Sequence, residues 1–200
     1  YVFKFMEKQI AEGRQVYVVY PLIEESEHLD FKDLMDGYES MARRFPLPNY
    51  KLSIVHGKMK AKDKEYEMQQ FAKGFTNIMV ATTVIEVGVN VPNATVMVIE
   101  SANKFGLSQL HQLRGRVGRG SDKSYCVLMT DYKLSPTAKT RIETMVRTND
   151  GFEIAEEDLK LRGPGDILGT QQSGILDLKL GDLIKDNQIV VAARNIATEL

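Results

Sequence analysis

The first 130 residues alternate between short apolar runs and longer stretches with helical periodicity. The apolar runs, which are rich in β-branched residues and typical of buried strands, are Gln15–Tyr20, Lys51–Val55, Asn77–Ala81, Thr95–Ile99 and Ser124–Met129. Apolar side chains recur every three or four residues from Phe31 to Phe45, and again at Met68–Ala72, which predicts two helices. This alternation favours an α/β fold with a parallel sheet covered by helices on both faces. Such sheets carry their working loops at the carboxyl ends of the strands.

The pattern changes after residue 130. Ser135-Pro136 predicts an N-cap and the first residue of a helix, which Thr148–Gly151 should end. Phe152–Leu161 predicts a second helix, and the short connection between the two favours an antiparallel hairpin. A glycine-rich loop and a last amphipathic helical stretch follow up to Leu200. We therefore expect two parts, an α/β domain over 1–130 and a helical extension over 131–200.

Composition narrows the possible chemistry. Lysine and arginine total 26 against 27 for aspartate and glutamate, so the net charge of −1 gives no global attraction to a polyanion, and any nucleic-acid contact must come from local clusters. A single cysteine and three histidines without ligand spacing predict no metal site. No apolar run approaches the length of a membrane span. The opening residues resemble neither a signal peptide nor an initiator, so we expect a part of a longer polypeptide.

The sharpest local signal is an arginine-rich segment, in which Arg114, Arg116 and Arg119 fall within six residues and are separated by two glycines. Guanidinium groups match phosphate geometry, and glycine lets the backbone approach an anion. This segment predicts a cluster that faces a polyphosphate. The alternative is a solvated basic turn.

A second signal follows the strand Asn77–Ala81. Thr82 and Thr83 place two hydroxyls at the carboxyl end of that strand, where they can donate to phosphate oxygens. Gly88 and Asn90 then open a turn that can hold a ribose hydroxyl. The alternative is an ordinary connection between two strands.

A phosphate-binding loop of the form G-x-x-x-x-G-K-[ST] is absent from the sequence. We therefore expect the chain alone not to hydrolyse ATP. Ile23-Glu24-Glu25 could pass for a magnesium-binding pair, although a solvated loop explains it as well. Arg141 and Arg147, with Lys139, either face DNA or form a solvated helix face.

Taken together, the motifs resemble those of superfamily 2 helicases. The segments ATTxIExGxxxPxA and QLHQLRGRVGR are similar to motifs V and VI of that superfamily. Tyr17–Glu27 resembles motif IV, and His56–Met59 resembles a loop that faces nucleic acid. Glu157–Gly174 is similar to the translocation motif of the RecG family and of transcription-repair coupling factors. Over essentially its whole length, the chain is identified as a member of the RecG family of branch-migration helicases.

This resemblance implies a second RecA-like motor domain followed by a helical extension, with roles for individual residues. Arginine fingers and a supporting residue would reach the γ-phosphate of ATP: Arg116, Arg119 and Gln112. The nucleotide edge would be Gly88 and Asn90, where the family usually has aspartate in place of Asn90. Contacts to the DNA backbone would come from His56, Gly57, Lys58, Thr82 and Thr83. Coupling to translocation would involve Arg162, Gly163, Gly165, Gly169 and Gln172.

The resemblance also implies partners. ATP with Mg²⁺ would be bound mainly by a first motor domain, and the substrate would be branched or double-stranded DNA. The N-terminal motor and wedge domains would belong to the same polypeptide, which we expect to act as a monomer in the bacterial cytoplasm, at the nucleoid and away from membranes. Two alternatives remain, namely the motor of a transcription-repair coupling factor and a non-enzymatic module that binds DNA backbone. The net charge of −1 argues against strong independent binding by such a module.

Overall fold

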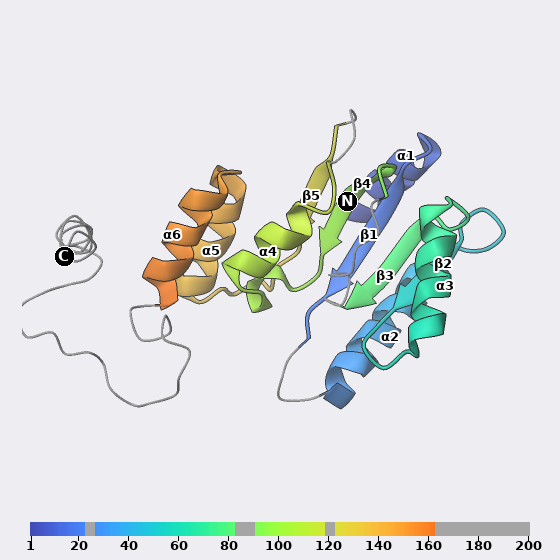
Figure 1. The fold of residues 1–200 in the computed structure, drawn as a ribbon, viewed down its shortest axis with the longest axis horizontal. Helices are drawn as coiled ribbons and strands as arrows, with labels where there is room; N and C mark the ends of the chain where they lie inside the picture. Colours follow the sequence, from blue (N-terminus) through green and yellow to red (C-terminus); the bar gives the residue numbers. More distant parts are fainter. Residues whose placement is uncertain (23–26, 83–90, 119–122, 163–200) are drawn as a thin grey trace, which may run out of the picture.

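The computed structural model describes residues 1–22, 27–82, 91–118 and 123–162 (Figure 1). Its elements follow the alternation that the sequence predicts. In chain order they are α1 (Val2–Ala11), β1 (Gln15–Tyr20), α2 (Glu27–Arg44), β2 (Leu52–Val55), α3 (Ala61–Ala72), β3 (Ile78–Thr82), β4 (Ala94–Ile99), a 3₁₀ turn (Ala102–Lys104), α4 (Leu107–Arg114), β5 (Tyr125–Leu128), α5 (Pro136–Arg147) and α6 (Gly151–Arg162).

The five strands form one parallel sheet in the order β2-β3-β1-β4-β5. The predicted α/β class is confirmed, and each predicted strand is present, with β1 matching at both ends and no end of the other strands differing by more than one residue. β1 lies in the centre of the sheet and pairs with β3 and β4. All carboxyl ends therefore meet at one edge of the sheet.

Helices cover both faces of this sheet. Val16 and Val18 of β1 point into a core with α1 and α2, where Met6, Leu34 and Phe45 are fully or almost fully buried. The alternate residues of the strands point to the other face. There they pack against α3, α4, α5 and α6 through the buried side chains Phe71, Leu107, Leu110, Leu113, Met145 and Ile154. The strands β3 and β4 are buried throughout, which explains why they appear in the sequence as continuous apolar runs.

The hairpin of α5 and α6 extends this second layer (Figure 1). Ser135 Oγ accepts a hydrogen bond from Ala138 N, and Pro136 occupies the first turn, so the predicted helix start is confirmed. Met145 and Ile154 share one core with the side chains of the sheet. The division into 1–130 and 131–200 stays a prediction.

One buried polar group ties β1 to the segment that follows α3. Gln15 is 3% exposed, and its Nε2 donates to the carbonyl oxygens of Phe71 (2.6 Å) and Thr76 (2.8 Å). The Phe71 carbonyl, in the last turn of α3, also accepts from Gly74 N (2.9 Å), whereas Gln15 is the donor that the structure shows for the Thr76 carbonyl.

Candidate functional site

The carboxyl edge of the sheet gathers several residues that the sequence assigns to DNA. His56 follows β2 directly, and Thr82 ends the neighbouring strand β3. The register pairs Val55 with Ala81, so His56 and Thr82 come next to each other along this edge. Tyr20 ends β1, and Glu100 follows β4 in the same row.

The loop after β2 is held by its own backbone and by α3. Met59 N donates to His56 O (3.2 Å), and Lys64 Nζ donates to Gly57 O (3.0 Å). Gly57 and Lys58 are exposed. Burial lowers the pKa of His56, and the positive charges of Lys64 and Lys58 lower it further. The loop thus combines an exposed backbone turn with a positive local potential.

The hydroxyl-bearing side chain of Thr82 is buried. Its side chain is 2% exposed, and its Oγ1 hydrogen-bonds to no described residue. A contact between this hydroxyl and DNA stays a prediction. Thr83, Gly88 and Asn90 lie outside the described residues.

Burial shifts the pKa of one carboxyl and one phenol at this edge. Burial raises the pKa of Glu100, and burial together with the Glu100 carboxylate raises the pKa of Tyr20. Ser101, the next residue, has left-handed backbone angles (φ 46°, ψ 47°), which a non-glycine residue rarely adopts. Sequence reasoning gave no role to Tyr20, which lies in the segment that resembles motif IV, or to Glu100, which lies in none of the motifs.

Helix α4 positions the arginine-rich segment. Its buried side chains Leu107, Leu110 and Leu113 fix it against the sheet, and Gln112 points outward as an exposed residue. Arg116 follows the helix and is half-buried, and Gly118 has a positive φ of 83°. Arg119 lies outside the described residues. Gln112 thus lies in the last turn of α4, and Arg116 lies two residues after the helix ends.

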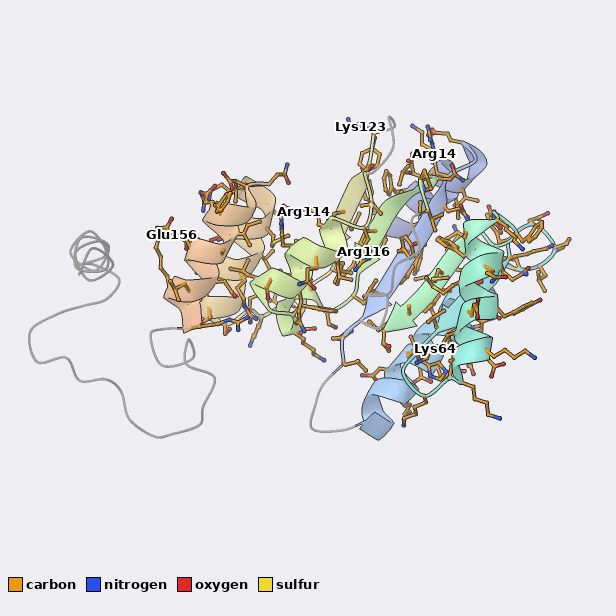
Figure 2. The ribbon with its side chains drawn as sticks, in the orientation of Figure 1. Arg14, Lys64, Arg114, Arg116, Lys123 and Glu156 are labelled. Atoms are coloured by element: carbon orange, nitrogen blue, oxygen red, sulfur yellow. The ribbon has the colours of Figure 1, made fainter. Side chains whose placement is uncertain are left out.

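Arg114 does not belong to the polyphosphate-facing cluster that the sequence predicts. Its Nη1 donates to the carbonyl oxygens of Met145 and Thr148, both at 2.8 Å, and its Nη2 lies 3.1 Å from His111 Nδ1. Figure 2 shows Arg114 between α4 and the α5–α6 pair, with Arg116 further toward the sheet. The prediction is wrong for Arg114, because its guanidinium binds carbonyl oxygens at the end of α5, more than 30 residues further along the chain.

The hairpin arginines are also directed inward or paired. Arg141 Nη1 donates to Phe105 O (2.5 Å), and its Nη2 donates to Asn103 O (3.1 Å). Arg147 pairs with Glu153 on the surface. Of the two roles that the sequence allows for these arginines, neither contact matches the DNA-facing one.

Arg162 links the end of α6 to the start of α4. Its Nη2 lies 3.0 Å from Asp158 Oδ2 and 3.5 Å from Ser108 Oγ. Gly163, Gly165, Gly169 and Gln172 lie outside the described residues. Helix α4 is therefore tied to the hairpin at both ends, to α6 at its first turn and to α5 at its last.

Within residues 1–22, 27–82, 91–118 and 123–162, no group of three or more His, Cys, Asp or Glu side chains could hold a metal ion. In the described part of the chain, no helix is both long enough and apolar enough to cross a membrane.

Comparison with known proteins agrees with this architecture. Residues 2–121 match the family described as helicase conserved C-terminal domain, and residues 148–200 match the family described as ATP-dependent DNA helicase RecG, domain 3, C-terminal. The sheet, the segment after α4 and these matches define the C-terminal RecA-like domain of a helicase motor. The chain therefore belongs to the family described as helicase conserved C-terminal domain, and within that class it is similar to RecG helicases.

The similarity extends over the whole chain. ATP-dependent DNA helicase RecG of Synechocystis sp. is 50% identical over 196 residues, which is 98% of this chain and 23% of that protein. The Bacillus subtilis RecG is 48% identical over 199 residues, which is 100% of this chain and 29% of that protein. A structure of RecG bound to a three-way DNA junction superposes with a TM-score of 0.71 at 41% identity, covering 94% of this chain and 24% of that one. The chain thus spans about a quarter of the length of these relatives.

Proposed function

We propose that this chain is the C-terminal motor part of an ATP-dependent double-stranded DNA translocase that remodels branched DNA, such as replication forks and Holliday junctions. The family membership supports this, and so does the relative whose structure is described as bound to a three-way DNA junction. Its partners in this proposal are branched DNA and the N-terminal motor and wedge domains of the same polypeptide, which acts as a monomer.

The donors at the end of α4 suit a nucleotide phosphate. Gln112 is exposed and Arg116 is half-exposed, so both can reach a group presented by a neighbouring domain. ATP with Mg²⁺ supplies the phosphoryl group to be transferred and is held mainly by the first motor domain. Arg116 and Arg119 stabilise negative charge on its γ-phosphate oxygens, and Gly88 and Asn90 line the nucleotide edge. In other nucleotide hydrolases such a finger accelerates the reaction by about 10³–10⁵.

The observation that carries the proposal is the attachment of α4 at both ends to the hairpin. Arg116 lies two residues beyond Arg114, and Arg114 binds the carboxyl end of α5. Arg162 joins α6 to the first turn of α4 and begins the segment Gly163, Gly165, Gly169 and Gln172. When the motor domains close and Arg116 engages the phosphate, α4 moves as a rigid element and the hairpin moves with it. The loop after Arg162 then pushes against the duplex, while His56, Gly57, Lys58, Thr82 and Thr83 hold the DNA backbone.

The test uses the intact parent protein and separates chemistry from movement. Arg116→Ala should lower ATP turnover by about 10³-fold or more while nucleotide binding falls much less, because the finger acts on the charge that develops during transfer. Arg119→Ala should behave in the same way. Arg162→Ala should leave DNA-stimulated hydrolysis largely intact and impair movement along duplex DNA.

The matched control is Arg147→Ala, since this side chain is exposed and pairs only locally with Glu153. It should change neither activity. Unchanged turnover in Arg116→Ala and Arg119→Ala would show that the arginine segment is a surface turn. Normal hydrolysis together with normal fork processing in Arg162→Ala would remove the coupling role.

A further inference from the structure

A basic segment follows the loop after β2 and continues into α3. Between His56 and Lys64 every second residue from Lys58 onward is a lysine, namely Lys58, Lys60, Lys62 and Lys64, and Asp63 is the one carboxylate in that stretch. The chain as a whole has a net charge of −1, so this segment is a local departure from the average. Its net charge is positive even after Asp63 is counted.

The four lysines do not share one role. Lys64 is half-buried and donates to Gly57 O, so it braces the loop. Lys60 immediately precedes α3, and Lys62 lies in its first turn; both are exposed. Within the described residues, neither of these two side chains forms an ion pair or a hydrogen bond. No residue of the described part of the chain therefore pairs with their charges.

The position of the two lysines relates them to the DNA-contacting edge. The loop from His56 to Met59 runs from the carboxyl end of β2 to Lys60, so Lys60 and Lys62 lie just beyond it on the outer flank of the sheet. Figure 2 shows Lys64 of α3 at this end of the molecule. The lowered pKa of His56 supports a positive potential here, since Lys64 and Lys58 contribute to the shift after burial.

The cations of α6, on the opposite flank, are paired. In α6, Lys160 lies 3.2 Å from Glu156 and 2.9 Å from Glu157, and Arg162 lies 3.0 Å from Asp158. The basic side chains of α6 are thus paired within their own helix. A phosphate backbone on the α3 side would meet Lys60 and Lys62, which pair with no described residue. On the α6 side it would meet Lys160 and Arg162, which already pair with carboxylates of their own helix.

We propose that Lys60 and Lys62 bind phosphates of the DNA backbone and extend the contact of the His56–Lys58 loop onto the first turn of α3. The proposal rests on the proposed function and adds two phosphate contacts on the α3 flank of the sheet. Each lysine that neutralises a phosphate releases condensed counterions, so its contribution appears as a term in the salt dependence of binding.

The experiment is a salt titration of junction binding by the intact parent protein, with a fluorescent three-way DNA junction as the probe. In the double variant Lys60→Gln/Lys62→Gln, the slope of log Kd against log salt should fall by about 1.8, since each neutralised phosphate contributes about 0.9. Between 50 and 200 mM salt this is about a 12-fold smaller change in affinity than in the wild type. Lys60→Arg/Lys62→Arg should keep the wild-type slope, because the charge is retained.

The matched control is Lys51→Gln/Lys73→Gln. These exposed lysines lie at the opposite ends of the same elements, just before β2 and just after α3. The control removes the same charge and should leave the slope unchanged. A wild-type slope in Lys60→Gln/Lys62→Gln, or an equal loss in the control, would overturn the proposal and leave the two lysines to solvent or to an acidic protein surface. A wild-type protein that does not bind the junction at all would instead overturn the proposed function, and this inference with it.

Discussion

Replacing Arg114 by alanine tests the attachment of α4 to the hairpin. The substitution removes two charge-assisted hydrogen bonds of 2.8 Å to the carbonyl oxygens of Met145 and Thr148. Each bond of this kind contributes about 1.5–3 kcal/mol when buried. Arg114 is partly exposed, so water replaces some of the lost interaction, and we expect a loss of about 2–3 kcal/mol for the pair. In a chain of this size, this lowers Tm by about 5–10 °C.

Urea denaturation of the purified 200-residue chain, followed by far-ultraviolet circular dichroism, measures the free energy of unfolding. Hydrogen exchange then locates the change, which should concentrate in α5 and α6. Arg114→Lys should give an intermediate loss, because an ammonium keeps the charge but not the planar fork. Arg147→Ala is the control, since its ion pair with Glu153 is exposed and screened by solvent, so its loss should change stability little. If Arg114→Ala and Arg147→Ala destabilise the chain equally, Arg114 does not tie α4 to α5.

Three further substitutions test other features by the same unfolding measurements. Gln15→Leu should cost about 1–3 kcal/mol, because the Thr76 carbonyl loses its buried donor while the Phe71 carbonyl keeps Gly74 N. The exposed Gln69→Leu should cost little, and equal losses would contradict this role. Gly118→Ala should cost about 1–2 kcal/mol because φ is +83° there, whereas Gly115→Ala, at φ −69°, should be close to neutral. Glu100→Gln should raise stability at pH 7. Burial raises the pKa of this carboxyl above its ordinary value of 4.5, so the wild type loses stability as the pH rises from 4.5 to the raised pKa. The gain should shrink below about pH 4.5, where the carboxyl is protonated in both states; a gain that does not change with pH would refute the burial argument.

The sheet could be predicted because its strands carry local signals. Strands buried on both faces require continuous apolar runs, and such runs are visible without any tertiary information. The start of α5 was predicted from Ser135 and Pro136, because both act on adjacent backbone groups. Helix α1 was not predicted. It has no side-chain N-cap, and its burial through Met6 depends on the sheet that it covers.

The residues of the candidate site likewise fall into those that local motifs mark and those whose role depends on tertiary contacts. His56, Gly57, Lys58, Gln112 and Arg116 could be located from motifs and strand ends, and the structure places them at the carboxyl edge or at the end of α4. The different role of Arg114 could not be predicted. Its partners are 31 and 34 residues away along the chain, and only the packing of α5 against α4 brings them within reach.

The central place of β1 has a consequence for biosynthesis. Its two neighbours in the sheet are about 60 and 80 residues further along the chain. At about 5–20 residues per second, a ribosome takes several seconds or more to deliver both of them. Throughout that interval the run Gln15–Tyr20 has no partner strands and exposes apolar side chains that are later almost entirely buried. The nascent chain is therefore most prone to aggregation, and most dependent on chaperones, between the emergence of β1 and that of β4.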